Sequence, residues 1–363
     1  MLISVGLTFG FLATFTLGAV YAERKISAFI QDRVGPMETG PYGVFQTLAD
    51  VMKLVTKELI IPTQADKVLF VLAPILILLP VFTGMAALPF GPDLVGVDFH
   101  LGLLFLVAIV SVDVMGILMA GWGSGNKYAL IGSARAVAQI ISYEIPVALA
   151  LLAGIMMFGT MDLQELSALQ GIHSPGPIKL WGIWEIEQTG GLLAWAVVRY
   201  PHLLFAYIIY FIGSLAECNR APFDLPEAES ELVGGFHVEY SGLRFAFVFL
   251  AEYGKMFIVS VLAAVVFWGG WNSPLPNIFV GDMALPLADW TNGEPGSIVG
   301  NLWGAFWLLT KAFLGILLQI WARWTYPRVR VDQLMTYCWK YLIPAGLVLF
   351  FLSGCLRLWE VSA

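Results

Sequence analysis

The segment from Ala216 to Tyr240 holds an unusual concentration of carboxylates. They are Glu217, Asp224, Glu227, Glu229, Glu231 and Glu239. Arg220 is the one cation among them, and Pro, Phe, Leu and Val lie between the acids, which indicates packing. Three acids at every second position repel one another when ionised, so we expect repulsion and desolvation to raise pKa values among Glu227, Glu229 and Glu231 toward neutrality. Such carboxyl groups can take up and pass on protons near pH 7, whereas the alternative is a solvated acidic loop.

Further ionisable residues lie inside long apolar stretches. They are Asp113, Glu144, Glu252, Lys255 and Lys311. Each costs about 2.5–3.5 kcal/mol at the centre of a bilayer, so we expect them to face a protein interior or a wet cavity. Glu252 and Lys255 are three residues apart and can pair on one helix face. Lys311 has no acid nearby in sequence and needs a partner from another helix. Together these groups predict a polar path for protons or ions, although Asp113 can instead be a satisfied partner between helices.

The composition restricts the class of protein. Of 363 residues, 59% are hydrophobic and 12% are charged, and the mean hydropathy is +0.80. These values exclude a soluble globular enzyme and a disordered chain. The net charge of −7 argues against a nucleic-acid partner. Three cysteines without a C-x-x-C pair give no local iron–sulfur or structural zinc signature.

The hydropathy pattern predicts an all-α polytopic membrane protein, with residues 1–363 forming a single integral membrane domain. A membrane-spanning helix needs about 20 apolar residues. We predict eight spans at about 2–22, 68–90, 99–121, 135–158, 200–216, 245–268, 301–322 and 341–359. Continuous apolar runs, such as Phe70 to Val81, exclude the alternating pattern of a membrane β-barrel.

The distribution of cations predicts the orientation. Most lysines and arginines fall in the connections 1–2, 3–4, 5–6 and 7–8, and few fall on the opposite side. By the positive-inside rule, these connections face the cytoplasm or its organellar equivalent. Eight spans then place both termini outside. The expected location is a bacterial cell inner membrane, with an organellar membrane as the alternative.

An amphipathic helix is predicted in the first of these connections, at about 43–58. Its apolar stripe consists of Val44, Leu48, Val51 and Val55, and its polar stripe consists of Gln46, Asp50, Lys53 and Lys57. Two interpretations remain open. The helix can be a membrane-surface anchor, or its polar stripe can pack against a soluble partner or line a polar cavity.

These motifs resemble one known family. The matching residues are Glu23, Arg24 and Lys25, then Gln31, Arg33, Gly35 and Pro36, then Gln46, Asp50, Lys53, Lys57 and Glu58. Together with 129–146, 216–240 and 323–340, they resemble the H subunit of respiratory complex I, also called subunit 1 of NADH–quinone oxidoreductase. The order and spacing agree over essentially the whole chain.

The resemblance implies a protein that joins the membrane arm to the peripheral arm of a proton-pumping enzyme. It would form much of the quinone chamber and begin a chain of carboxylates toward antiporter-like subunits. Quinone would be the substrate. Iron–sulfur clusters and flavin would be held by partner subunits, so this chain would contain no catalytic redox centre and no metal. Partners would be the peripheral quinone-site and iron–sulfur subunits, small membrane subunits and lipid.

The resemblance also assigns roles to residues of this chain. The quinone channel would be lined by Arg24, Arg33, Asp50 and Lys53. The proton path would comprise Glu144, Glu217, Asp224, Glu227, Glu229, Glu231, Glu252 and Tyr253. The charge of these acids would be balanced by Arg220, Arg323, Arg328 and Arg330. Asp113, Lys255 and Lys311 match no family position, so their roles rest on the cost of burying charge alone.

Two alternatives remain. The first is the homologous ion-translocating subunit of a membrane-bound hydrogenase, which would not use quinone. The run from Gln31 to Pro36 and the basic and acidic amphipathic helix favour the quinone enzyme over it. The second is an autonomous proton-coupled transporter, against which the lack of an internal repeat counts mildly.

Overall fold

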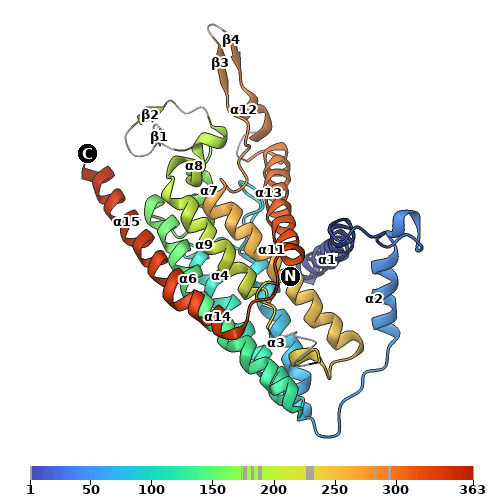
Figure 1. The fold of residues 1–363 in the computed structure, drawn as a ribbon. Coiled ribbons are helices and arrows are strands. Elements are labelled where there is room, and N and C mark those ends of the chain that lie inside the picture. The colour runs from blue at the N-terminus through green and yellow to red at the C-terminus, as the bar shows by residue number, and fades with distance from the viewer. Residues whose placement is uncertain are drawn as a thin grey trace.

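The computed structural model describes residues 2–362, except 173, 175–177, 181–183, 187–189, 226–232, 281–282 and 293–295. Helices dominate the described part (Figure 1). The predicted proton-path residues Glu227, Glu229 and Glu231 lie outside the described residues.

The helices vary widely in length. The long ones are α1 (Leu2–Ile30), α3 (Lys67–Ala86), α6 (Lys127–Phe158), α9 (His202–Glu217), α11 (Gly242–Phe267), α13 (Ile298–Thr325) and α15 (Ile343–Ser362). The shorter ones are α2 (Gln46–Thr56), α4 (Gly102–Val110), α5 (Val112–Gly123), α7 (Leu163–Ala168), α8 (Ala196–Arg199), α12 (Leu287–Asn292) and α14 (Val331–Tyr337). Single turns occur at η1 (Pro41–Gly43), η2 (Gly191–Ala194), η3 (Gly235–His237) and the π-helical η4 (Cys338–Leu342).

Two short antiparallel hairpins complete the described structure. They are β1 (Ile178–Leu180) with β2 (Trp184–Ile186), and β3 (Ile278–Val280) with β4 (Met283–Leu285). Both project from the end of the bundle opposite the turn between α2 and α3 (Figure 1). The connection 269–300 therefore contains β3, β4 and α12.

Six helical segments are long and apolar enough to cross a membrane. They are α3, the 102–123 segment of α4 and α5, α6, α11, α13, and the 331–362 segment of α14, η4 and α15. The predicted count of eight is not confirmed. The fifth predicted span corresponds to α9, which has 16 residues and is shorter than the usual 20. The first lies in α1, whose first four side chains fall outside the described set.

The helix α6 begins eight residues before the predicted start of its span. The Asn126 side chain caps it by accepting a hydrogen bond from the Tyr128 amide at 2.9 Å. Its first turns carry Lys127 and Arg135 but bury small residues such as Gly132. A Cβ on Gly132 would lie 2.9 Å from the Cα of Gly235, so this helix packs directly on η3. Because Lys127 and Arg135 are charged, a search for apolar runs does not include this part of the helix.

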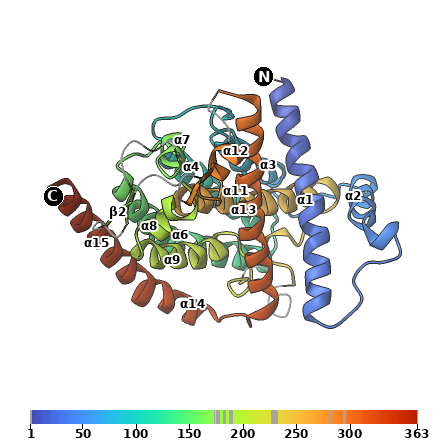
Figure 2. The same cartoon turned by 90° about the horizontal axis from the view of Figure 1, so that it is seen from above.

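The helix α11 forms the centre of the bundle and is almost entirely buried. It packs on α13, α3, α9 and α1. Gly254 permits this close approach, because a Cβ there would lie 2.4 Å from Val81 of α3 and 2.9 Å from Leu12 of α1. By contrast α15 is mostly exposed and lies along the outside of α6 (Figure 2).

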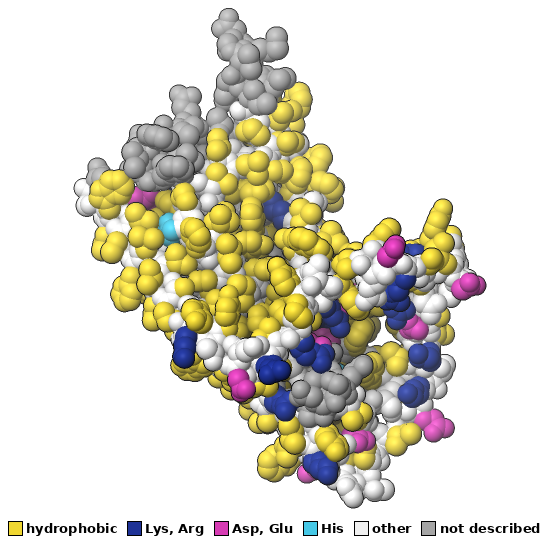
Figure 3. Space-filling view, viewed as in Figure 1, with side chains coloured by type: hydrophobic (Ala, Val, Ile, Leu, Met, Phe, Trp, Pro, Cys, Tyr) yellow, Lys and Arg dark blue, Asp and Glu magenta, His cyan; other side chains and the backbone are white. Residues whose placement is uncertain are grey.

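The surface divides into an apolar body and a charged end. Apolar side chains cover the visible flank of the bundle, while charged side chains gather around α2 and the adjoining connections (Figure 3). An exposed apolar flank of this extent is typical of a lipid-facing surface. The structure therefore has the form of an integral membrane protein with its charged residues concentrated at one end.

Candidate functional site: a cavity joined to buried charges

A cavity of about 210 Å³ lies between α1, α2 and α11. Its lining residues are Thr16, Leu17, Val20, Arg24, Thr47, Asp50, Val51, Lys53, Leu54, Phe245 and Phe249. Arg24 of α1 and Asp50 of α2 form an ion pair with 2.7 Å between the guanidinium and the carboxylate. The cavity thus combines aromatic and aliphatic walls with a few charged groups, which is the usual make-up of a site for an amphiphilic small molecule.

The amphipathic pattern of α2 explains how it forms one wall. Asp50 and Lys53 lie on the face that lines the cavity, while Leu48 and Val55 on other faces are about half exposed. The cavity face of α2 thus carries both charged and apolar side chains, since Val51 and Leu54 line the cavity together with Asp50 and Lys53.

Both ends of α2 are held to the bundle. Near its start, the Tyr21 hydroxyl donates to the Tyr42 carbonyl at 3.0 Å. Beyond its end, the Ser241 hydroxyl donates to the Glu58 carbonyl at 3.1 Å. Gly242 has φ +57°, and a Cβ there would lie 2.9 Å from the Lys57 carbonyl oxygen, so this close approach requires glycine.

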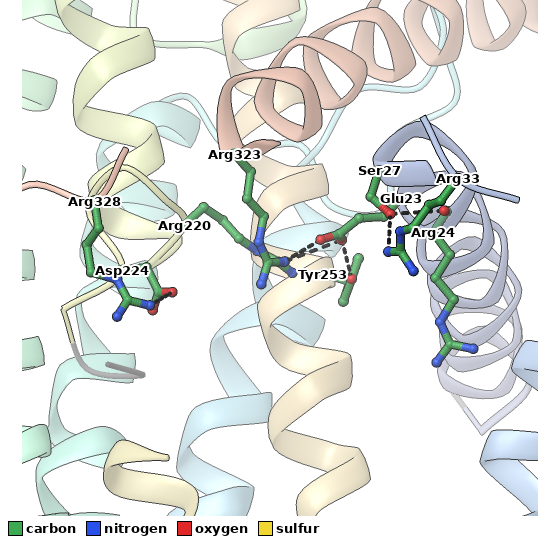
Figure 4. A network of polar contacts seen from close by, with 9 residues as sticks. All are labelled: Glu23, Arg24, Ser27, Arg33, Arg220, Asp224, Tyr253, Arg323 and Arg328. Atoms are coloured by element: carbon green, nitrogen blue, oxygen red, sulfur yellow. Dashed lines mark hydrogen bonds and ion pairs between the residues drawn. The ribbon is translucent and has the colours of Figure 1, made fainter. Parts of the chain in front are cut away.

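Glu23, one residue before Arg24, is the centre of a buried polar network (Figure 4). Its carboxylate accepts hydrogen bonds from Arg323 of α13 and from the Tyr253 hydroxyl, the latter at 2.5 Å. The Arg220 guanidinium lies 3.4 Å from the same carboxylate and 4.5 Å from the centre of the Tyr253 ring. We call Glu23, Arg220, Tyr253 and Arg323 the Glu23 cluster. It contains two cations and one acid.

The Glu23 cluster adjoins the cavity. Phe249 lines the cavity, and its ring centre lies 4.9 Å from that of Tyr253. Arg24 projects from the other side of α1, away from Glu23 (Figure 4). Two adjacent residues of α1 therefore belong to different sites: Arg24 faces the cavity, and Glu23 faces the protein interior.

Deeper in the bundle lies a second group of charges, which we call the inner acid group: Asp113, Glu144, Glu217, Glu252 and Lys255. Lys255 of α11 forms a buried ion pair with Asp113 of α5. Its ammonium also lies 3.5 Å from the carbonyl oxygen of Glu217. Asp113, Glu252 and Lys255 line one small cavity of about 10 Å³. Four acids and one lysine thus share this part of the interior.

A hydrogen bond from Ser111 holds Glu144. Ser111 separates α4 from α5, and its hydroxyl donates to the Glu144 carboxylate of α6. Two residues later, Asp113 contacts Lys255 of α11. The predicted pairing of Glu252 with Lys255 was wrong, because Asp113 reaches the ammonium from the neighbouring helix.

The connection after α9 is tied to the connection after α13. Arg328 pairs with Asp224 at 2.8 Å, and the Val329 amide donates to the Pro222 carbonyl at 2.9 Å. Arg330 is exposed and lies next to this junction in sequence. Elsewhere, at the start of α3, Tyr240 packs flat on Phe70, and burial raises the pKa of its phenol, so this side chain remains neutral.

Some assigned residues lie elsewhere. Arg33 does not line the described cavity, since its guanidinium donates to Gln31 at 2.7 Å and to Ser27 at 3.5 Å. Lys311 pairs with no acid among the described residues, and donates instead to the Gly270 and Asn272 carbonyl oxygens at 2.8 and 2.6 Å. No group of three His, Cys, Asp or Glu side chains in the described part of the chain can hold a metal ion.

Glu23 is a site residue that the role assignment missed. The sequence offered one signal, because orientation at a helix end requires only cations and Glu23 stands before Arg24 and Lys25. Its partners come from residues 220, 253 and 323, so no local spacing could reveal them.

The fold and the site define a class of protein: a helical membrane protein with a cavity at its charged end and buried ionisable groups behind it. The model of the NADH dehydrogenase family matches residues 3–354. The chain belongs to this family.

Named relatives agree with the family match. All three are H subunits of NADH-quinone oxidoreductase. The chain is 53% identical to the one numbered 2 in Cytophaga hutchinsonii, over 94% of each chain. It is 52% identical to that of Chlorobium luteolum, over 98% of this chain and 88% of the relative. The relative from Bacteroides fragilis is 42% identical over 91% of this chain and 83% of its own length. Each relative matches along most of its length.

Proposed function

We propose that this chain is the membrane subunit of a proton-pumping NADH–quinone oxidoreductase. In this role it forms part of the quinone chamber and couples quinone reduction to proton translocation through buried carboxylates. The observation that carries the proposal is the continuity from the cavity through Phe249 and Tyr253 to the Glu23 cluster and the inner acid group. The names of the relatives support the assignment of the chain to NADH–quinone oxidoreductase.

The cavity suits an amphiphilic quinone. Leu17, Val20 and Phe245 offer apolar contacts for an isoprenoid tail, while Arg24, Asp50 and Lys53 offer polar contacts at the same wall. A volume of about 210 Å³ accommodates part of such a molecule, since small-molecule sites usually span about 300–1,000 Å³. The remainder of the chamber would come from partner subunits, which would also hold the flavin and the iron–sulfur clusters.

The Glu23 cluster would respond to charge in the chamber. Reduction of a quinone to a quinol takes two electrons and two protons, so negative charge develops before the protons arrive. Arg220 and Arg323 exceed Glu23 by one charge, and a largely buried cluster screens external charge poorly. Negative charge in the chamber would attract these arginines and loosen their hold on Glu23.

The inner acid group would receive the resulting signal. Arg220 pairs with Glu23 and also interacts electrostatically with Glu252. A buried carboxylate must be paired or protonated, so a shift of Arg220 changes how many of the four acids hold a proton. Protons released or taken up here would then pass to neighbouring membrane subunits. The acids at 227, 229 and 231 belong to the same proposed path.

The proposed orientation places the α2 end of the molecule on the cytoplasmic side of a bacterial inner membrane. The charged residues of Figure 3 gather at that end, as the positive-inside rule requires of its cations. Both chain termini would lie on the outer side. Partner subunits of the peripheral arm would then cover the cavity end, and membrane subunits and lipid would cover the apolar flank.

A substitution of Glu252 tests the coupling. We expect Glu252→Gln in the assembled complex to slow NADH–quinone reduction and proton translocation together by at least ten-fold, because one proton-accepting group is lost from the path. Purified complex in proteoliposomes would report both rates, and NADH oxidation by a soluble acceptor would check the peripheral arm. Glu58→Gln, at an exposed position, is the matched control. Wild-type rates of reduction and pumping in Glu252→Gln would refute the proposal.

A photoreactive quinone tests the chamber itself. We expect it to label peptides from α1, α2 and α11 and to be displaced by unmodified quinone. Displaceable labelling confined to other parts of the chain would place the quinone elsewhere. The hydrogenase alternative predicts no displaceable labelling, and the transporter alternative predicts an active chain without partner subunits.

A further inference from the structure

A second and larger hollow lies on a different side of the bundle. It measures about 420 Å³, opens to the outside, and is formed by α9, the end of α13, α14 and the connections beside them. Its lining residues are Phe211, Ile212, Leu215, Pro222, Phe223, Ala322, Tyr326, Val329, Gln333 and Tyr337. We call it the α9–α13 groove. None of its lining residues belongs to the cavity between α1, α2 and α11.

The arrangement of three helices creates the groove. In Figures 1 and 2, α13 and α15 lie on either side of α9 and diverge. Outward-facing residues of α9 such as Phe205 and Ile208 therefore remain exposed. The floor of the groove is buried, since Leu215 and Phe223 are 4% and 6% exposed. The groove is thus continuous with the lipid-facing flank yet reaches into the protein.

Two connected loops close the groove at its charged end. The Val329 amide donates to the Pro222 carbonyl, and the Arg328–Asp224 pair stands beside this bond. The Phe223 ring lies 5.4 Å from the ring of Tyr143 on α6, which fixes the inner wall. The groove is therefore a built feature with a closed polar end and an open apolar end.

Cations without carboxylate partners lie around the closed end. Arg328 is already matched by Asp224. Arg330 and Lys340 are exposed, and no carboxylate among the described residues pairs with either of them. Asp332 is the exposed acid between them in sequence, so these three described residues together carry one excess positive charge. This excess complements an anionic group.

Exposed aromatic residues indicate the depth at which the closed end of the groove lies in the bilayer. Tyr326, Tyr337, Trp339 and Tyr341 are all more than 40% exposed. Exposed tyrosine and tryptophan side chains concentrate where hydrocarbon meets headgroups. The cations therefore lie at headgroup level, while the groove extends toward the hydrocarbon.

The groove is open, has mostly apolar walls, and lies beside the two cations Arg330 and Lys340. An occupant that combines an apolar chain with an anionic group matches both features. A flexible hydrocarbon chain fits a narrow apolar space. We propose that the α9–α13 groove binds one acyl chain of an anionic phospholipid, whose headgroup lies against Arg330 and Lys340. This site is separate from the proposed quinone chamber and does not depend on it.

Photolabelling of the whole complex tests the proposal. Purified complex is placed in phosphatidylcholine vesicles that contain a trace of phosphatidylglycerol with a photoreactive acyl chain, and labelled peptides are identified. We expect labelling of α9, the 222–223 connection and α14, which unlabelled phosphatidylglycerol displaces more strongly than phosphatidylcholine does. Equal displacement by the two lipids, labelling only outside the groove, or a partner polypeptide crosslinked at these residues would overturn it.

Two sets of variants separate the tail from the headgroup. Ala322→Phe fills the groove and should abolish labelling there, whereas Ala345→Phe, on the exposed face of α15, should not. Arg330→Gln and Lys340→Gln alter exposed residues and should each weaken phosphatidylglycerol competition about five-fold, because a cation near a lipid surface contributes about that much.

The matched charge control is Lys67→Gln, at an exposed position away from the groove, with no expected effect. If both Arg330→Gln and Lys340→Gln compete like wild type, the headgroup assignment is wrong. In all of these variants, photoreactive quinone should still label the cavity between α1, α2 and α11. Loss of quinone labelling alone would therefore challenge the proposed function and not the lipid site.

Discussion

The Glu23 cluster and the inner acid group are neighbouring buried sites with opposite charge balance. The Glu23 cluster has two arginines for one glutamate, and every charged member has a partner within hydrogen-bonding reach. The inner acid group has four carboxylates for one lysine, and only Asp113 pairs with it directly. The first arrangement suits a fixed charge. The second cannot hold all its acids ionised and therefore suits a variable number of protons.

The difference indicates a division of roles, in which the Glu23 cluster keeps its net charge and the inner acid group changes its number of protons. A cluster that depends on a single acid has no replacement for it. A group with several acids around one cation can redistribute protons when one acid is lost. Substitutions that remove one acid from each site should therefore have unequal effects on stability.

The largest effect is expected for Glu23→Gln. This change leaves the buried Arg220 and the partly buried Arg323 without a counter-charge, and breaking a buried pair costs about 3–5 kcal/mol. We expect little assembled complex on a native gel and loss of quinone reductase activity. Arg323→Gln in the Glu23→Gln background should restore part of the assembly by removing one cation. Normal assembly of the single variant would show that Glu23 is not essential to the cluster.

A smaller effect is expected for Asp113→Asn. Lys255 loses its direct partner, but Glu217 and Glu252 are near enough for one of them to neutralise the ammonium. We expect assembly and midpoint temperature close to wild type, with proton translocation reduced several-fold because one proton-binding group is gone. Lys255→Met should be more damaging than Asp113→Asn, since it leaves only acids. The reverse order would contradict the proposed redistribution.

The smallest effects are expected at the cavity wall. The Arg24–Asp50 pair is partly exposed, and such pairs contribute about 1 kcal/mol or less, so Asp50→Asn should raise the KM for quinone up to about five-fold. Arg33→Gln should change KM less than two-fold, because Arg33 contacts Ser27 and Gln31 and not the cavity. A larger effect of Arg33→Gln would indicate that the quinone chamber reaches the 31–36 turn.

Much of the fold could be predicted from the sequence, because long apolar segments identify membrane helices by composition alone. Six predicted spans agree with long apolar helices, and the family resemblance is confirmed. The early start of α6 was missed, because Lys127 and Arg135 interrupt an apolar run without interrupting a helix. The hairpin and short helix within 269–300 were missed too, since turn-rich composition does not exclude brief pairing.

The candidate site was only partly predictable, because its contacts join residues far apart in the chain. Asp50 and Lys53 were identified by their stripe on one helix, and they do line the cavity. The partners of Glu23 and Lys255 depend on how helices pack, which spacing within one helix cannot reveal. The nearest acid in sequence to Lys255 was therefore the wrong partner.

The carbonyl contacts of Lys311 have a mechanical consequence for α13. Its ammonium donates hydrogen bonds to two carbonyl oxygens beyond the end of α11. These bonds hold α13 to the end of α11 at this point. Arg323 lies twelve residues further along α13, about 18 Å away along a helix. We expect any displacement of Arg323 to swing α13 about Lys311 like a lever, and the greatest travel to fall at the end nearest Glu23.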